Sequence, residues 1–520
     1  MNPRTKNLME LTLAGVIAMA GTTTSGSATA AVSAWVCPAQ YKPSPVAEDV
    51  IGYKGARASL RRSNATCRGG TIRLFGARAE DLGFQVIFER TGDEPAAGLE
   101  LKVSGFSGGL RPEVNLYLVA YTMSKGAKRK GRLIEIPWSP DACVPFETAG
   151  VRPFSIPVNV KGLPTPGKQV TQAVWVDIYV PRKAKPGSYT ATVTASQAGR
   201  TVASFPLELT VWPFEIPVER SIEGEFNAYR CAFANHWKLD PTTDAYIALE
   251  HKFLRACDDH RTLMNIMPYH GQQGFAYRGR APILAGAGKT LHVKDWTVYD
   301  KRFGPVFTGR IFRDGRPAAA MYLPFNLEWP EPLRNWHPKT REKRWHSLWV
   351  ENFSDYPRPD YNWKKHSPAE REAYESAFAN VLREWIAHAR KRGWTRTEFQ
   401  VYFNQKPQKK TAGSDLGPNR ATHRYDEWAV KDDMLALKYY LDLTRRATAG
   451  VKDVDVVFRV DISRFIGGPG MGKYGRPQDQ FDKLGGPKLL GAVDCWYVGM
   501  HSYRLEACQQ ACRELSEQGK

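Results

Sequence analysis

The sequence lacks any apolar run long enough to cross a membrane. The run near the amino terminus, Leu11–Ala20, is much shorter than the ~20 residues that a membrane-spanning helix needs. It follows Arg4 and Lys6 and precedes a stretch of small residues that ends at Ala30. This order is typical of a secretory signal peptide. We therefore expect residues 1–30 to be a signal peptide, the protein to be secreted or periplasmic, and no transmembrane segment to be present.

Acidic residues are fewer than basic residues: the chain has 53 Asp and Glu residues and 73 Lys and Arg residues, which gives a formal net charge of +20. A surface of this sign attracts polyanions. Short basic clusters occur at Arg61-Arg62, at 125–132 and at 406–410. For an exported protein an anionic or sulfated glycan is a better-suited partner than nucleic acid, so we predict no nucleic-acid partner. The other interpretation of these clusters, solvated loops and faces, stays open.

Cysteine is sparse as well, with eight residues in a chain of 520. This excludes a small disulfide scaffold, and a hydrophobic content of 42% excludes a disordered chain. Cys508 and Cys512 are four residues apart on a predicted helix, but zinc would need two further ligands at matching spacing and none is nearby. We predict no metal and no cofactor. The sequence determines neither the disulfide pairing nor the oligomeric state.

Residues 31–215 have the alternation of β-strands. Apolar residues recur at every second position in two segments, 174–180 and 205–211, and Pro and Gly residues separate the segments. No helical pattern intervenes. Short strands divided by turns favour an antiparallel β-sandwich. We therefore predict an accessory β-sandwich domain over residues 31–215.

Residues 216–520 alternate short apolar strands with amphipathic helices, which is typical of βα units and a parallel sheet. The predicted strands are 222–229, 263–269, 319–327, 397–403, 454–461 and 493–498. The clearest helix begins at the capping box Ser367–Glu370 and ends at Gly393, and a second helix ends before Gly450. The pattern predicts a catalytic domain of (β/α)₈-barrel type. Because only six units are found, the barrel is either incomplete at the carboxyl terminus or has further units within 270–320.

Carboxylates at the carboxyl ends of the predicted strands are candidates for catalysis, because the active sites of parallel barrels lie there. They are Glu225, Glu328, Glu331, Asp426, Glu427, Asp461 and Asp494. Asp426 and Glu427 stand out because they directly precede a helix that begins near Val430. Adjacent residues of a strand point to opposite faces, but at a strand-to-helix turn both can face one cavity. The other interpretation is that Asp426 caps the helix and Glu427 interacts with the helix dipole.

Two parts of the sequence resemble glycoside hydrolase family 123 and its relatives. Ala173–Pro181, Pro186–Thr190 and Leu209–Trp212 resemble the sandwich domain that precedes the barrel in these relatives. The relatives also carry an Asp-Glu-Pro motif followed by a helix, and Tyr425–Trp428 with the helix after it resembles that motif. The resemblance spans most of residues 150–500 and implies a glycoside hydrolase with a β-sandwich followed by a (β/α) barrel.

The resemblance implies retaining hydrolysis of a β-linked N-acetylhexosamine, typically N-acetylgalactosamine, in which the 2-acetamido oxygen of the substrate attacks the anomeric carbon. Asp426 would orient the acetamide group and offset the positive charge of the cyclic intermediate. Glu427 would protonate the leaving oxygen and then activate water, which requires a raised pKa. The negative charge of Asp426 shifts the pKa of Glu427 in that direction.

Four aromatic residues are candidates for the floor of a sugar-binding site: Trp329, Tyr402, Trp428 and Trp496. Aromatic rings offer flat apolar faces to sugar rings, but large aromatic residues are also common in cores. Both interpretations are open for three of them. We expect Trp428 to face the cleft, because it directly follows the acidic pair.

Two departures from the family pattern support alternatives. Trp428 replaces the proline of the motif, and the chain ends where the family continues toward its last strands. The sequence is therefore also compatible with a catalytically inactive carbohydrate-binding protein on the same scaffold, or with a basic surface protein that binds anionic polysaccharide. It does not determine the sugar, the linkage, or whether the action is exo or endo.

Overall fold

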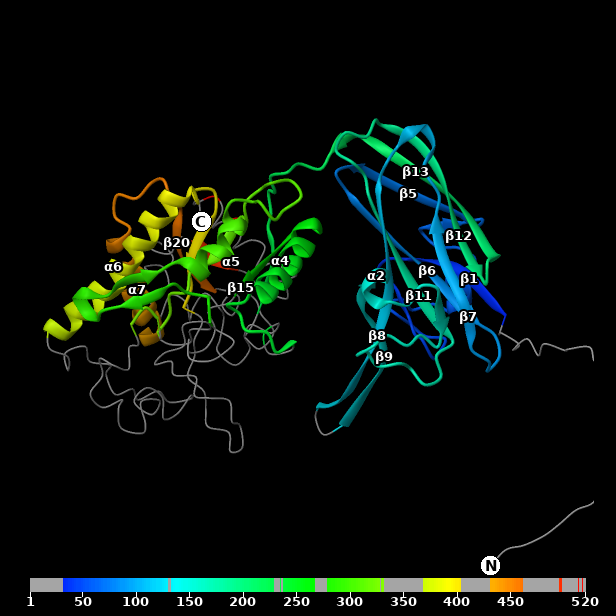
Figure 1. Ribbon diagram of the computed structural model, residues 1–520, viewed down its shortest axis with the longest axis horizontal. Helices are drawn as coiled ribbons and strands as arrows, with labels where there is room; N and C mark the ends of the chain where they lie inside the picture. The colour runs from blue at the N-terminus through cyan, green and yellow to red at the C-terminus, as the bar shows by residue number, and fades with distance from the viewer. Residues whose placement is uncertain are drawn as a thin grey trace, which may run out of the picture. The chain divides into compact units, whose positions relative to one another are not determined.

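The computed structural model describes residues 31–129, 132–228, 234, 237–266, 278–327, 329–331, 368–403, 431–461, 495–497, 513 and 517. The predicted signal peptide lies outside the described residues. The chain divides into two compact units, Met1–Pro217 and Val218–Lys520. We call them the sandwich unit and the parallel-strand unit; Figure 1 shows that the first is built mainly of strands and that the second combines strands with helices α4 to α7.

The sandwich unit contains two large β-sheets. The five-stranded sheet has the order β1-β6-β11-β8-β9, with every neighbouring pair antiparallel. Its strands are β1 (Val32–Pro38), β6 (Asp81–Arg90), β8 (Glu113–Arg129), β9 (Arg132–Pro145) and β11 (Thr171–Tyr179). The six-stranded sheet has the order β10-β7-β12-β13-β5-β4 and consists of β4 (Cys67–Arg68), β5 (Thr71–Arg78), β7 (Ala96–Val103), β10 (Phe154–Ile156), β12 (Gly187–Gln197) and β13 (Arg200–Glu215). Smaller elements are β2 (Lys42–Pro43), β3 (Val50–Ile51), α1 (Arg57–Arg62), η1 (Ser107–Gly109) and α2 (Phe146–Ala149).

The core of this unit lies between the two sheets. Val174 and Val176 of β11 and Leu207 and Leu209 of β13 are buried in one hydrophobic cluster. Every second side chain of a strand points to the same face, so the predicted alternation produces the two inner faces of a sandwich. The alternation predicted from the sequence is confirmed.

One strand pair of the sandwich differs from the prediction. β13 runs parallel to β5, so the unit is not wholly antiparallel. The two strands are far apart in the chain, and only strands joined by a short hairpin are obliged to pair antiparallel. The local alternation carries no signal of this pairing.

The parallel-strand unit contains short strands that run in one direction. β14 (Gly224–Ala228) pairs with β15 (Thr262–Ile266), and a four-stranded sheet has the order β18 (Ala320–Tyr322), β19 (Glu398–Val401), β20 (Val456–Asp461) and β21 (Cys495–Tyr497). All four pairings between these strands are parallel. The six strands overlap the six predicted segments, which confirms the strand positions.

A complete eight-stranded barrel is not shown by the described residues. Residues 278–320 hold the antiparallel hairpin of β16 (Ile283–Ala285) and β17 (His292–Asp295), with η3 (Gly288–Thr290) between them, followed by α5 (Thr297–Phe307). This hairpin forms a sheet of its own and adds no strand to the parallel set. The option that residues 270–320 hold further βα units is therefore wrong for the described part of that segment.

Helices accompany these strands: α4 (Asp244–Asp259), α5, α6 (Pro368–Arg392) and α7 (Lys431–Ala447). The apolar stripe predicted on α6 is buried, including Phe378 and Trp385, and the helix is followed by Gly393 with a φ of +72°. α6 and α7 lie side by side (Figure 1), where the hydroxyls of Tyr374 and Tyr440 are 3.0 Å apart. In the described part of the chain, no helix has the length and apolar content to cross a membrane.

Candidate functional site

β19 and β20 carry mainly apolar side chains on one face and mainly polar side chains on the other. Phe399 and Val401 of β19 and Phe458 of β20 belong to the hydrophobic core. Gln400 and Arg459 alternate with them and therefore point to the opposite face. We call this opposite face the polar strand face; it carries Glu225, Asn227, Asn265, Tyr322, Glu398, Gln400, Tyr402 and Arg459.

A buried ion pair lies at the centre of the polar strand face. Arg459 Nη1 of β20 donates to both carboxylate oxygens of Glu225 on β14, at 2.9 and 2.8 Å, and to Gln400 Oε1 at 2.8 Å. The Arg459 side chain is 2% exposed and that of Glu225 is 11% exposed. Burial opposes the charge of Arg459, but the neighbouring Tyr322 and Glu225 outweigh burial and hold its pKa above the usual value. The guanidinium is therefore a fixed cation with its anion beside it.

Two tyrosines cover this ion pair. The rings of Tyr322 and Tyr402 stack with centroids 5.2 Å apart, and the Arg459 guanidinium lies 4.9 and 5.2 Å from the two centroids. Tyr322 Oη is within hydrogen-bonding distance of Glu225 Oε1 at 2.7 Å and of Asn227 Oδ1 at 3.0 Å. The face thus combines aromatic surface with charged donors and acceptors, a combination suited to a ligand rich in hydroxyl groups.

A second carboxylate lies next to this network. Gln400 Nε2 donates to Glu398 Oε1 at 2.6 Å. Burial raises the pKa of the Glu398 carboxyl; the bond from Gln400 opposes the rise, and the charge of Asp455 adds to it. Glu225 is paired with an arginine and Glu398 accepts from an amide, so the two carboxylates of this face lie in different surroundings.

Asn265 of β15 contributes a buried donor to the same face. Its Oδ1 accepts from the Tyr322 amide at 2.8 Å. In the strand register, Asn265 lies opposite Asn227 of β14. Asn265 is fully buried, and its Nδ2 has no hydrogen-bond partner within the described part of the chain. Buried polar groups are nearly always paired, so a water molecule or a polar ligand group would complete this one.

The structure brings some of the predicted site residues together and not others. Tyr402 lies on the polar strand face beside Arg459. Trp329 lies in the hydrophobic core, with its ring edge-to-face against Phe325 at 4.8 Å, which is the core interpretation that the sequence left open. Trp496 lies on β21, opposite Val460 in register. Asp426, Glu427 and Trp428 lie outside the described residues, and their proposed roles stay predictions.

Sequence reasoning missed Tyr322, Gln400 and Arg459. A signal for Arg459 was present, because it interrupts the apolar segment Val456–Val460, and arginine is rarely buried in a strand without a partner. Glu225 was among the candidate carboxylates, but the sequence gave no indication that these two residues pair. No group of His, Cys, Asp and Glu side chains among the described residues is arranged to hold a metal ion.

The comparisons with known proteins agree with this architecture. No family model and no curated protein sequence matches the chain. Among solved structures, it is similar to a family 123 glycoside hydrolase from Clostridium perfringens that hydrolyses glycolipid glycans, with 13% identity, a TM-score of 0.53, and coverage of 94% of this chain and 71% of that one. A Bacteroides ovatus GH5 xyloglucanase (9% identity, coverage 86% and 87%, TM-score 0.23) and the N-terminal domain of PorA (8% identity, coverage 35% and 98%, TM-score 0.16) also match, at TM-scores too low to carry an argument. The chain therefore has a distantly glycoside hydrolase-like fold.

Proposed function

We propose that the protein is an exported glycoside hydrolase that acts on β-linked N-acetylhexosamine residues of glycans by a substrate-assisted retaining mechanism. The observation that carries this proposal is the likeness of fold to a family 123 glycoside hydrolase over 94% of the chain. The polar strand face supports it, because catalytic side chains of parallel sheets project from such strands. The acidic pair in the sequence supplies the remaining groups.

In this proposal the substrate supplies its own nucleophile, the 2-acetamido oxygen. Asp426 orients the acetamide, and Glu427 gives a proton to the leaving oxygen and later takes one from water. The buried ion pair of Glu225 and Arg459 binds sugar hydroxyls, and Tyr402 provides an aromatic surface beside it. These assignments make the polar strand face a binding surface and the acidic pair the reacting groups.

A non-catalytic carbohydrate-binding protein is the second candidate. Trp428 in place of the motif proline favours it. Both candidates predict sugar binding, and only the first predicts bond cleavage.

Release of p-nitrophenol from β-N-acetylgalactosaminide and β-N-acetylglucosaminide substrates separates the two candidates. We expect the wild type to cleave at least one substrate, and Glu427→Gln to lower kcat about 10²–10⁴-fold because it removes the group that activates water against the cyclic intermediate. Glu208→Gln, on an exposed strand position of the sandwich unit, is the matched control and should cleave like the wild type. Background-level release from the wild type and from both variants would exclude the hydrolase and leave sugar binding to be measured by calorimetry.

A further inference from the structure

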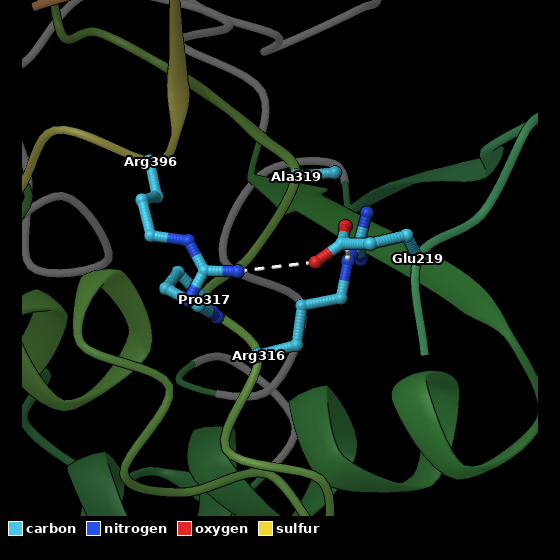
Figure 2. Close-up of a pocket in the computed structure, with 5 residues that line it drawn as sticks. All are labelled: Glu219, Arg316, Pro317, Ala319 and Arg396. Atoms are coloured by element: carbon cyan, nitrogen blue, oxygen red, sulfur yellow. Dashed lines mark hydrogen bonds and ion pairs between the residues drawn. The ribbon is translucent and has the colours of Figure 1, made fainter. Parts of the chain in front are cut away.

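A pocket lies at the amino ends of two parallel strands, away from their carboxyl ends. Its lining residues are Glu219, Arg316, Pro317, Ala319 and Arg396, and its volume is about 310 Å³ (Figure 2). Ala319 directly precedes β18, and Arg396 lies two residues before β19. Catalytic groups of parallel barrels project from the carboxyl ends of strands, so this pocket is at the opposite end of the strands from the one that the proposed function uses.

Two guanidinium groups converge on one carboxylate in this pocket. Arg316 Nε donates to Glu219 Oε2 at 3.0 Å, and Arg396 Nη2 donates to Glu219 Oε1 at 3.0 Å. Figure 2 shows the Glu219 carboxylate extending between the two arginine side chains. A pair of arginines with one donor on each oxygen is the arrangement by which proteins recognise carboxylate and sulfate groups.

Arg316 is held more firmly than either Glu219 or Arg396, whose side chain is 63% exposed. Arg316 is 10% exposed and also donates to Glu223 at 2.6 Å, so it keeps a partner when Glu219 leaves. The Glu219 side chain is 70% exposed and lies in a segment without regular secondary structure. A ligand can therefore displace Glu219, while Arg316 stays in position because Glu223 still holds it.

The surroundings of the pocket are rich in positive charge. Arg220 and Arg261 lie beside Arg316: burial and the charges of Arg220 and Arg316 lower the pKa of Arg261, while Glu223 and Asp258 oppose the shift. Arg220 is balanced by Glu223 and Asp258, which leaves Glu219 as the anion for the exposed guanidinium of Arg396. Without Glu219, this group of side chains has an excess of cations.

We propose that this pocket is a binding site for an external oxyanion, the carboxylate or sulfate group of an acidic sugar, and that Glu219 occupies the site until such a ligand displaces it. The proposal does not depend on hydrolysis at the other end of the strands. It assigns part of the excess of Lys and Arg in this chain to a specific recognition site. A single oxyanion bound by two guanidiniums would fill the place that the Glu219 carboxylate now takes.

Calorimetric titration of the full chain with glucuronate, with sulfate, and with uncharged glucose at constant ionic strength tests the proposal. We expect binding of at least one anion and none of glucose. Glu219→Gln removes the competing charge and should tighten anion binding about tenfold, and Arg396→Gln should weaken it about tenfold, each equivalent to about 1.4 kcal/mol. A preference for glucuronate or for sulfate identifies the group that the site accepts.

Arg390→Gln is the matched control, because Arg390 is an exposed arginine that also pairs with one carboxylate, Asp453, outside the pocket. It should bind anions like the wild type. Arg396→Lys keeps the positive charge but lacks the planar guanidinium group with its several donors, so it should retain part of the affinity. This variant separates a loss of anion recognition from a failure to fold. The proposal is overturned if neither the wild type nor Glu219→Gln binds an anion, or if Arg396→Gln and Arg390→Gln behave alike. A lower melting temperature of Glu219→Gln without any anion binding would also overturn it and make Glu219 a structural anchor.

Discussion

Buried polar side chains in the sandwich unit bind mainly to the backbone. Gln85 Nε2 donates to the carbonyls of Pro38 and Tyr41, at 3.2 and 2.7 Å. Arg57 Nη2 donates to the carbonyl of Ser44 at 2.9 Å and to two further carbonyls nearby. These side chains hold the irregular segment after β1 against the sheet, so they fix the path of the chain.

On the polar strand face, the buried polar side chains bind mainly to one another, apart from Asn265, which accepts from the Tyr322 amide. Arg459 contacts Glu225 and Gln400, and Tyr322 contacts Glu225, all through side-chain atoms. The strands there are already held by their own ladders, so this network is not needed to route the backbone. A side chain that is bonded to backbone carbonyls holds the path of the chain, so losing these bonds disturbs the fold. A side chain that is bonded only to other side chains can replace one of these bonds with a bond to a ligand while the strands stay in place.

The largest expected effect is on the sandwich unit. Arg57→Leu removes the donor to three carbonyls, of which that of Ser44 is buried, and one partner of Glu89, so it should lower the free energy of unfolding by about 3–5 kcal/mol. Urea unfolding, with hydrogen exchange to assign the transition to this unit, measures the change. Arg73→Leu, which breaks the exposed pair with Glu208, should cost less than about 1 kcal/mol. Equal effects of the two variants would contradict a structural role for Arg57.

A matched pair of tyrosines gives the next largest effect. Tyr322→Phe removes a hydrogen bond to the charged Glu225 and should cost about 1.5–3 kcal/mol, and Tyr121→Phe, which removes bonds to the backbone of Thr171 and Ala173, should cost about 0.5–1.5 kcal/mol. Only Tyr322→Phe should weaken N-acetylhexosamine binding, measured by calorimetry. If both variants or neither changed the affinity, the distinction between the two kinds of buried polar group would be lost.

The smallest effect concerns pH. Burial raises the pKa of Glu398 in the folded state, so the folded chain binds this proton more tightly than the unfolded chain does. The contribution of Glu398 to stability is therefore present below the unfolded pKa of glutamate, about 4.3, and is lost as the pH rises through the raised folded value. Glu398→Gln should raise the melting temperature at neutral pH, and the gain should shrink toward about pH 4. Glu208→Gln should show no such pH-dependent difference, and a constant gain for Glu398→Gln at both pH values would refute the assignment.

The strands that were recognised in the sequence, such as β11 and β13, carry a local period. Val174 and Val176 flank the half-buried Trp175, and the α6 stripe repeats every three or four residues. The hairpin of β16 and β17 was not recognised, because its side chains are exposed or half-buried and β17 carries a single apolar residue, Val293.

The candidate site was predictable only in part, because its contacts are long-range. Glu225 and Arg459 are 234 residues apart in the chain, and only the order and register of the strands bring them together. Tyr402 was recognised as an aromatic residue at a strand end, but the stacking of Tyr322 on it depends on the pairing of β18 with β19. The pocket at Glu219 likewise joins segments that no local pattern connects.

The place of β5 in its sheet bears on how the sandwich forms during synthesis. β5, near the beginning of the unit, lies between β4 and β13, and β13 ends at Glu215. The neighbour that β5 needs is therefore among the last residues of the unit to leave the ribosome. Contacts of such long sequence separation form slowly. The sandwich cannot assemble strand by strand as it emerges, and its six-stranded sheet closes only when the whole unit has been made.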